Sequence, residues 1–298
     1  MTTETKSSDR ELVAHNYCLA FIDLLGQRDA MRGQGLLKPI ESEGQREAFH
    51  DVLRNSIGAI IKLQERAEEM LRPILEENLD SPHRSALSPE QQAIWDAMER
   101  TRIETQRWSD GLVSFVCLGD TDMRCRMNGV FGIFVLAGTL CLLGLATGRP
   151  IRGAIEIAWG IELHPGELYG PAVARAYELE SEIAQYPRIV LGPEAVKFLD
   201  AHAANAEQDI FSQNDRELAA LCLKMLVRDA DGRWILHYLG DTFQNSVTHG
   251  YHVELHGAAR KFVLDQLLTH RAQRNTKLSF RYSHLLQYFD AHPPTKPE

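Results

Sequence analysis

The predicted order of strands and helices places this chain in the α+β class. Short apolar runs predict strands over 17–23 and 151–163 and a β-hairpin over 101–118, while helical spacing of apolar residues predicts helices over 43–75 and 122–147. The resulting order of strand, helix, strand, strand, helix and strand is the split βαβ plan of ferredoxin-like sheets. We therefore expect a mainly antiparallel sheet with helices packed against it.

The 298 residues divide into three predicted parts. Residues 1–14 are polar and predict a flexible N-terminus, residues 15–185 hold the βαββαβ core, and residues 186–298 form a C-terminal α/β extension packed on that core. The elements predicted in the extension are strands over 189–191 and 234–239 and helices over 193–201, 251–271 and 276–291.

Two shorter helices are predicted from their start signals. Pro89 suits the first turn of a helix that runs to about residue 100, and Ser88 is its candidate N-cap. Gly170 and Pro171 begin a second helix, which we expect to run to about residue 184.

Composition argues for a cytoplasmic protein that does not bind nucleic-acid duplexes. The net charge is −9 and the sequence lacks a basic stripe. The five cysteines are scattered without a C-x-x-C pair, which favours reduced thiols in the cytosol. The first residues lack the apolar run of a secretory signal.

One uncharged apolar segment, 129–148, is long enough to span a membrane. Glycine, alanine and threonine dilute its hydrophobicity, and neither an aromatic belt nor a basic cluster flanks it. The strand predicted over 151–163 pairs with earlier strands, which a spanning helix would prevent. We therefore expect a buried core helix and no membrane insertion.

Two acids beside glycines are the candidate site residues. Asp23 ends an apolar strand, where an ionised carboxylate is costly to bury, and Asp110 lies at the turn of the hairpin. In the predicted sheet these strands are neighbours, so the two acids can face each other. Divalent cations such as Mg²⁺ or Mn²⁺ remove the repulsion between paired carboxylates. Taken alone, Asp110 is equally a common turn residue.

The residues after Asp23 suit a phosphate. Gly26 allows a tight turn, so the backbone amides of Leu25, Gly26 and Gln27 can cradle an anion. Metal-binding acids beside such amides are what a nucleoside triphosphate requires, since the metals neutralise the phosphates and activate an attacking hydroxyl.

The chain resembles the catalytic domain of class III nucleotidyl cyclases over about residues 15–185. That family's first metal motif is an apolar strand ending in Asp, two residues and Gly, as in Phe21-Ile-Asp23-Leu-Leu-Gly26. Its Gly-Asp hairpin is replaced here by Ser109-Asp110, with glycine displaced to Gly111, and its Gly-x-x-Val helix start is similar to Gly170-Pro-Ala-Val173.

The departures from the family pattern concern base and transition-state recognition. Gln106 stands where purine cyclases carry a base-reading Lys, and the acidic partner of that Lys would fall near Glu167. The family's transition-state Asn and Arg would fall at Ala174 and Glu178. The available substitute cations are Arg175, which is also a plausible surface ion-pair residue, and Arg152, which can instead pair with Glu156 or another acid.

The segments Ile151-Arg-Gly-Ala-Ile155 and 169–180 resemble the pyrimidine cyclases of bacterial anti-phage Pycsar systems. The resemblance implies synthesis of cyclic UMP or cyclic CMP as a second messenger for a separate effector protein. It also implies a homodimer with shared active sites. We favour UTP as the substrate, although the Gln106 amide can pair with either pyrimidine.

The implied mechanism assigns a role to each candidate residue. Asp23, Asp110 and the Leu24 carbonyl hold two divalent cations, Mn²⁺ or Mg²⁺, and the amides of 25–27 hold the triphosphate. The residues assigned to the nucleotide are Phe21, Gln106, Trp108 and Glu167, and Trp108 is also a candidate for packing. The alternatives are a degenerate cyclase domain that senses a nucleotide, and a cytidylate or purine cyclase. A diguanylate cyclase-like enzyme is disfavoured because its Gly-Gly-Asp/Glu-Glu-Phe turn is missing.

Overall fold

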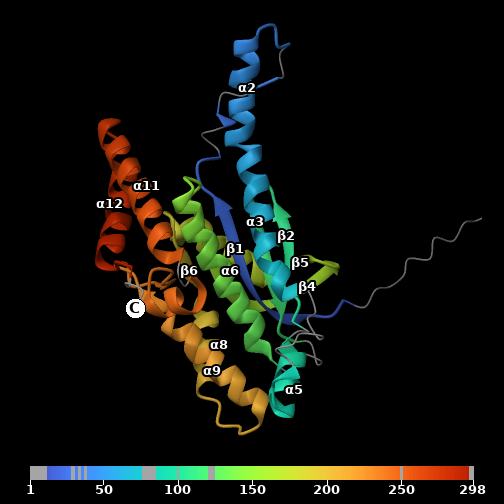
Figure 1. Ribbon diagram of the computed structural model, residues 1–298. Helices are drawn as coiled ribbons and strands as arrows, with labels where there is room; N and C mark the ends of the chain where they lie inside the picture. The colour runs from blue at the N-terminus through green and yellow to red at the C-terminus, as the bar shows by residue number, and fades with distance from the viewer. Residues whose placement is uncertain are drawn as a thin grey trace, which may run out of the picture.

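A single mainly antiparallel sheet is the centre of the molecule. The computed structural model describes residues 12–27, 31–32, 35–36, 39–75, 85–98, 101–119, 125–248 and 251–294, without the side chains of 70–75. Eight strands of the described parts join in this sheet. Helices cover it on both sides, so the structure has the α+β class predicted from the sequence (Figure 1).

The first four strands follow the ferredoxin-like order. β1 (His15–Leu24) lies between β3 (Gly111–Cys117) and β4 (Ile151–His164), and β2 (Glu104–Trp108) pairs with β3 at the edge. All three pairings are antiparallel. The register places Asp23 opposite both Gly111 and Arg152.

The sheet continues into the C-terminal part of the chain. β6 (Ile189–Leu191) adds to β4 in the parallel sense, and β8 (Trp234–Leu236) and β7 (Leu226–Arg228) follow in antiparallel order. A short strand, β5 (Glu167–Tyr169), folds back on the far end of β4.

Alternation along β1 divides its side chains between two apolar layers. Cys18, Ala20, Ile22 and Leu24 belong to the large core under α3 (Ile57–Leu75) and α6 (Arg126–Ala146). Tyr17, Leu19 and Phe21 belong to a smaller core under α7 (Pro171–Glu178). Because side chains alternate along a strand, Asp23 projects to the α7 side of the sheet.

The apolar segment at 129–148 is a core helix, as predicted. Within the described residues, α6 is the one helix long and apolar enough to cross a membrane, yet most of it is buried inside the protein. It packs on β1, β3 and β4 and is covered on its other side by α9 (Ile210–Lys224) and α11 (His252–Ala272).

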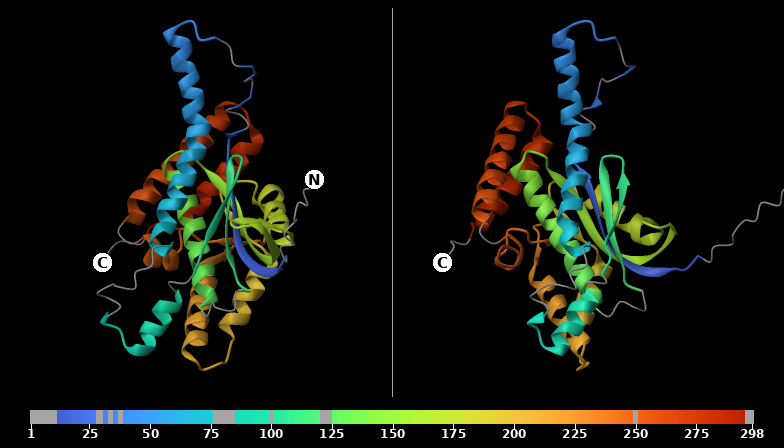
Figure 2. Two further views of the ribbon diagram at one scale, coloured as in Figure 1. Left: turned by 90° about the vertical axis from the view of Figure 1, so that its right-hand side faces the viewer. Right: turned by 45° about the vertical axis from the view of Figure 1, so that its right-hand side comes forward.

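Several boundaries differ from prediction. The helix predicted over 43–75 is two helices, α2 (Glu43–Asn55) and α3, which are separated at Ser56, where the backbone leaves helical geometry with φ −112° and ψ −87°. The buried Ser56 hydroxyl donates to the Val52 carbonyl at 2.6 Å. Figures 1 and 2 show α2 extending away from the sheet. The helix predicted to end near 184 changes at Leu179 into a π-helical turn, η1 (Leu179–Ala184).

The remaining helices lie near their predicted places. Ser88 caps α5 (Pro89–Met98) by accepting from the Gln91 amide at 3.3 Å. The predicted helices of the extension are α8 (Pro193–Ala203), α11 and α12 (Thr276–Ala291). We did not predict α9, β5, β7 or the short turns α10 (Asp241–Phe243) and η2 (Gln244–Thr248). The predicted ends at 99–100 and 122–124 lie outside the described residues.

Candidate active site

Asp23 and Asp110 meet at one end of the sheet. Asp23 precedes the last residue of β1, and Asp110 occupies the β2–β3 turn. The Leu24 amide donates to the Asp110 carbonyl at 3.3 Å, which ties the turn to the end of β1. Gly111 makes this approach possible, because a Cβ at that position would lie 2.5 Å from the Ile22 carbonyl oxygen.

The two acids repel each other. Burial raises the pKa of Asp23 to about 6, and the negative charge of Asp110 adds to the rise. Arg152 on β4 opposes the rise, with its Nη2 3.5 Å from Asp23 Oδ2. The site therefore holds negative charge that its own arginine only partly balances.

Glu180 is a third acid of the site. It lies on η1 with 2% of its side chain exposed, and it forms an ion pair with the Arg152 Nε. Burial raises the pKa of Glu180 to about 7; Arg152 lowers it, and the charges of Asp23 and Asp110 raise it. No sequence pattern marked Glu180 as a site residue. It lies between Glu178 and Glu182, and a helix with so many acids is predicted to be exposed to solvent.

Part of the predicted phosphate-binding loop, residues 25–27, already forms hydrogen bonds within the protein. The Leu25 amide donates to the Pro150 carbonyl at 2.9 Å, so it is already used. Gly26 has a positive φ of 89° and does not use its amide in a hydrogen bond within the described residues. The Gln27 side chain is buried, and its Oε1 has no partner in that part of the chain.

A cavity of about 330 Å³ opens beside this loop. Leu25, Gly26 and Pro150 form one wall, and Arg281 and Tyr282 of α12 form the other. Arg281 donates to the Gln185 Oε1 at 3.1 Å, and burial and the charge of Arg152 lower its pKa. Arg281 is therefore a second cation at the cavity beside Gly26, contributed by a segment too distant in sequence for motif reasoning to find.

Three predicted nucleotide residues lie on the same side of the sheet as Asp23 or beside the Asp110 turn. Trp108 pairs with Gly111 next to Asp110. Its ring meets the Phe21 ring edge-on with centroids 5.6 Å apart, and Phe21 meets Tyr177 of α7 at 5.5 Å. The Gln106 Oε1 accepts from the Leu168 amide at 3.1 Å, which places Gln106 beside β5 and the neighbouring Glu167.

Arg175 is engaged away from the acids. Its Nη2 lies 3.0 Å from Glu156 Oε2, and Glu156 is fully buried. Glu156 also accepts from the amides of Ile157 and Ala195. Arg175 therefore neutralises a buried structural acid, and Arg152 pairs with Asp23 and Glu180 instead of with Glu156.

The residues fit a divalent cation completed by a ligand. Within the described residues, three His, Cys, Asp or Glu side chains nowhere come together around one point. Asp23, Asp110 and the Leu24 carbonyl are hard oxygen donors, and Mg²⁺ in proteins is typically held by one or two carboxylates together with substrate phosphates. The raised pKa of Asp23 fits such a site, because a bound cation would stabilise the ionised carboxylate against both its burial and the charge of Asp110.

Comparison with known proteins gives no sequence family and only a slight structural likeness. No protein-family model matches the sequence, and no curated protein matches it. Among solved structures, the adenylyl cyclase CyaB from P. aeruginosa is similar at 13% sequence identity, over 64% of this chain and 84% of that chain, with a TM-score of 0.35. This overlap is slight, and the functional assignment rests on the residues of the site itself.

Proposed function

We propose that the protein is a metal-dependent nucleotidyl cyclase. It converts a pyrimidine nucleoside triphosphate, preferably UTP, to the 3′,5′-cyclic monophosphate and pyrophosphate. The observation that carries the proposal is the meeting of Asp23 and Asp110 at the end of β1, with the pKa of Asp23 raised to about 6. That arrangement suits phosphoryl transfer, in which positioning and charge neutralisation supply most of the catalysis.

Asp23, Asp110 and the Leu24 carbonyl would hold two divalent cations, Mn²⁺ or Mg²⁺. When bound, these neutralise the phosphates and lower the pKa of the ribose 3′-hydroxyl. The 3′-oxygen bonds to the α-phosphorus, the bond from that phosphorus to the α,β-bridging oxygen breaks, and pyrophosphate leaves. The hydroxyl proton passes to solvent. The Gly26 amide and Arg281 would bind the departing phosphates, and Arg152, which pairs with Asp23, would contribute a further positive charge.

The surroundings of Gln106 support UTP. The Gln106 Oε1 already accepts from the Leu168 amide, so its amide NH₂ remains to face a base. An NH₂ group donates to O4 of uracil, whereas cytosine carries an amino donor at that position. Trp108, Phe21 and Glu167 complete the proposed base pocket.

We further propose a cytoplasmic homodimer that signals to a separate effector protein in anti-phage defence, as the resemblance to Pycsar cyclases implies. Two observations support a dimer with shared sites: Trp108, beside the Asp110 turn, is 38% exposed, and Tyr177, which contacts Phe21, is 51% exposed. Exposed aromatics of this kind are enriched at protein interfaces.

The direct test is to incubate the purified protein with each of the four ribonucleoside triphosphates and Mn²⁺ or Mg²⁺, and to identify products by mass. We expect cyclic UMP from UTP, and a loss of about 100-fold or more in Asp23→Asn and Asp110→Asn. Asp265→Asn is the matched control, because Asp265 is an exposed acid paired with Lys261 on α11. Retained turnover in both site variants would contradict the mechanism.

Stability separates a lost site from a lost fold. Because burial and Asp110 disfavour the ionised form of Asp23, the Asp23→Asn variant should unfold at a temperature equal to or above that of the wild type. In the wild type, Mn²⁺ should raise the unfolding temperature, and in Asp23→Asn this effect should disappear.

A nucleotide sensor is the second candidate. Two observations favour it. Arg152 forms ion pairs with Asp23 and Glu180. Ala174 and Glu178 stand where class III cyclases, which the chain resembles, carry their transition-state Asn and Arg. A sensor would bind a nucleoside triphosphate without forming a cyclic product from any of the four. A cytidylate or purine cyclase would instead be identified by its product.

A further inference from the structure

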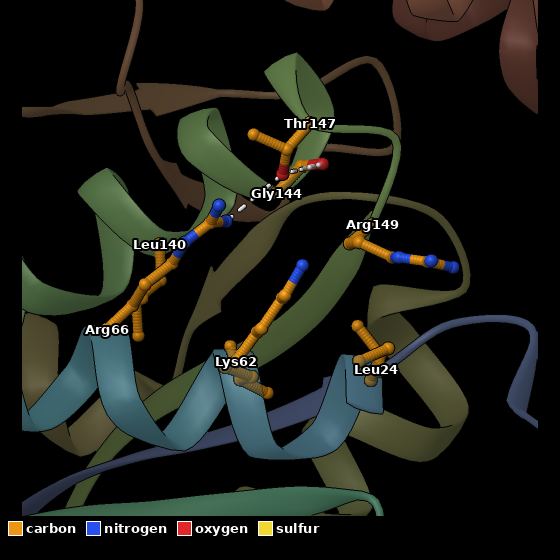
Figure 3. A pocket seen from close by; sticks show the side chains of 9 residues that line it. Leu24, Lys62, Arg66, Leu140, Gly144, Thr147 and Arg149 are labelled. Carbon is orange, nitrogen blue, oxygen red and sulfur yellow. Dashed lines mark hydrogen bonds between the residues drawn. The ribbon is translucent and has the colours of Figure 1, made fainter. Parts of the chain in front are cut away.

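A second cavity lies behind the end of β1, on the side of the sheet opposite Asp23. It has a volume of about 150 Å³ and sits between α3 and α6 (Figure 3). Its apolar floor includes Leu24 and Leu140. Its polar lining consists of Lys62 and Arg66 of α3, Thr147, and Arg149 of the turn before β4.

The charged side chains of this cavity are all cationic. Arg66 Nη1 donates to the Thr147 hydroxyl at 3.1 Å, and Arg149 Nη2 donates to Asn55 Oδ1 at 2.9 Å, so both arginines meet neutral oxygens. Lys62 extends between them in Figure 3 and has neither a hydrogen bond nor an ion pair within the described residues. This excess of positive charge occurs in a chain whose net charge is −9.

The backbone holds Arg149 in place. Its amide donates to the Gly144 carbonyl at 2.7 Å, and a Cβ at position 144 would lie 2.5 Å from the Arg149 carbonyl oxygen. Gly148 completes the turn with a φ of 70°. The last turn of α6 and the rim of the cavity are therefore built as one rigid unit.

These cations lie near the C-terminus of α6, where positive charge is favourable. That explains why the side chains are cationic, but most of their N–H donors have no acceptor within the described residues, since each arginine makes one side-chain hydrogen bond there. In the described parts of the chain, the final carbonyls of α6 are capped by the Thr147 hydroxyl and by the amides of 147–149. Within the described residues, the ammonium and guanidinium groups make no hydrogen bond to these carbonyls, and their remaining N–H groups can bind a ligand.

We propose that this cavity binds a small, multiply charged phosphate anion, either inorganic phosphate or pyrophosphate. Guanidinium forks and an ammonium point charge are the groups proteins use for phosphate oxygens. The cavity, at about 150 Å³, has room for either of these small anions. Because Leu24 forms one wall, the anion would contact the residue next to Asp23.

The test is isothermal titration of the full-length protein with sodium pyrophosphate and with sodium phosphate, in EDTA and at constant ionic strength without nucleotide. We expect saturable binding, tighter for pyrophosphate because it carries more charge. Lys62→Met and Arg149→Met should each weaken it at least about 10-fold, and Lys62→Arg should largely restore it. Arg107→Met is the matched control, since Arg107 is exposed and paired with Glu68 of α3.

Asp23→Asn distinguishes this proposal from the proposed enzyme activity. Anion binding that persists in Asp23→Asn and is weakened by Lys62→Met and Arg149→Met supports the cavity whether or not the protein is a cyclase. Binding that is lost in Asp23→Asn, is absent from the wild type, or is weakened equally by Arg107→Met would overturn the proposal. The unfolding temperature of each variant without anion verifies its fold. We expect no decrease for Lys62→Met and Arg149→Met, because each removes one of three neighbouring cations.

Discussion

Asp229 joins three segments through its side chain. It accepts hydrogen bonds from the Tyr186 hydroxyl, from Arg188 Nη1 at 2.6 Å and from His284 Nε2 at 2.8 Å. Burial alone would raise the pKa of Asp229, but these hydrogen bonds lower it to about 2. A carboxyl group whose pKa is lower in the folded than in the unfolded chain stabilises the fold when it is ionised.

The sign of this effect gives a prediction for pH. The contribution of Asp229 is complete above about pH 4, the ordinary pKa of Asp, and is lost as the pH falls toward 2. Asp229→Asn should lower the free energy of unfolding at pH 7 by about 2–3 kcal/mol. Urea unfolding should show that this difference narrows by about half at pH 3. A difference in the free energy of unfolding that stays constant between pH 7 and pH 3 would contradict this assignment to Asp229. Asp265→Asn, which changes an exposed acid, is the control.

At the residue scale, sequence reasoning reached Asp23 and Asp110 because both follow short-range patterns: an acid that ends an apolar strand, and an acid in a tight turn. Glu180 and Arg281 depend on the π-helical turn η1 and on the docking of α12. Neither depends on a local pattern. The ion pairs of Arg152 could not be predicted from the sequence either. Tertiary packing brings both Asp23 and Glu180 within ion-pair distance of its guanidinium.

Among the helices, α6 requires small residues where other elements cross it. A Cβ on Gly138 would lie 2.4 Å from the Phe243 ring, whereas a Cβ on the exposed Gly257 of α11 would have no atom within 4 Å. Alanine favours a helix over glycine by about 1 kcal/mol in both positions. Only at Gly138 does the new methyl group overfill the core.

These two glycines make a matched pair of variants. Gly138→Ala should lower the free energy of unfolding by about 1–3 kcal/mol, because the overpacking exceeds the gain in helix propensity. Gly257→Ala should raise it by up to about 1 kcal/mol. Chemical denaturation with the circular dichroism of helices as the signal measures both. If both variants changed the free energy of unfolding by the same amount and in the same direction, the packing around α6 would be looser than the contact between Gly138 and Phe243 indicates.

At the element scale, long periodic segments were the most predictable. α6, the β2–β3 hairpin and β4 follow directly from apolar periodicity. α9 was not predicted, although Asp209 is a recognisable N-cap that accepts from the amides of Phe211 and Ser212. The break at Ser56 was not predicted either, because a serine inside a helical pattern usually leaves the helix intact.

Across the whole molecule, the two halves of the chain share one core. The cluster around α6 includes residues of the predicted extension: Ile189, Leu236, Phe243, Val263 and Phe289. β6 also covers the edge of β4 that β1 leaves open. Sequence reasoning separated the halves at 185–186 because the βαββαβ plan and the cyclase resemblance end there, and it had no means of detecting a parallel strand pairing between them.

This shared core predicts that residues 1–185 do not fold alone. Removing 186–298 would expose the hydrogen-bonding edge of β4 and the side of α6 that faces Phe243 and Val263. An open edge beside an apolar face promotes aggregation. We expect the fragment to be insoluble, or to bind a hydrophobic dye and unfold without a cooperative transition, while the full chain unfolds cooperatively. A soluble fragment with a sharp urea transition would show instead that 15–185 is an independent domain and that the extension serves only to complete the site through Arg281.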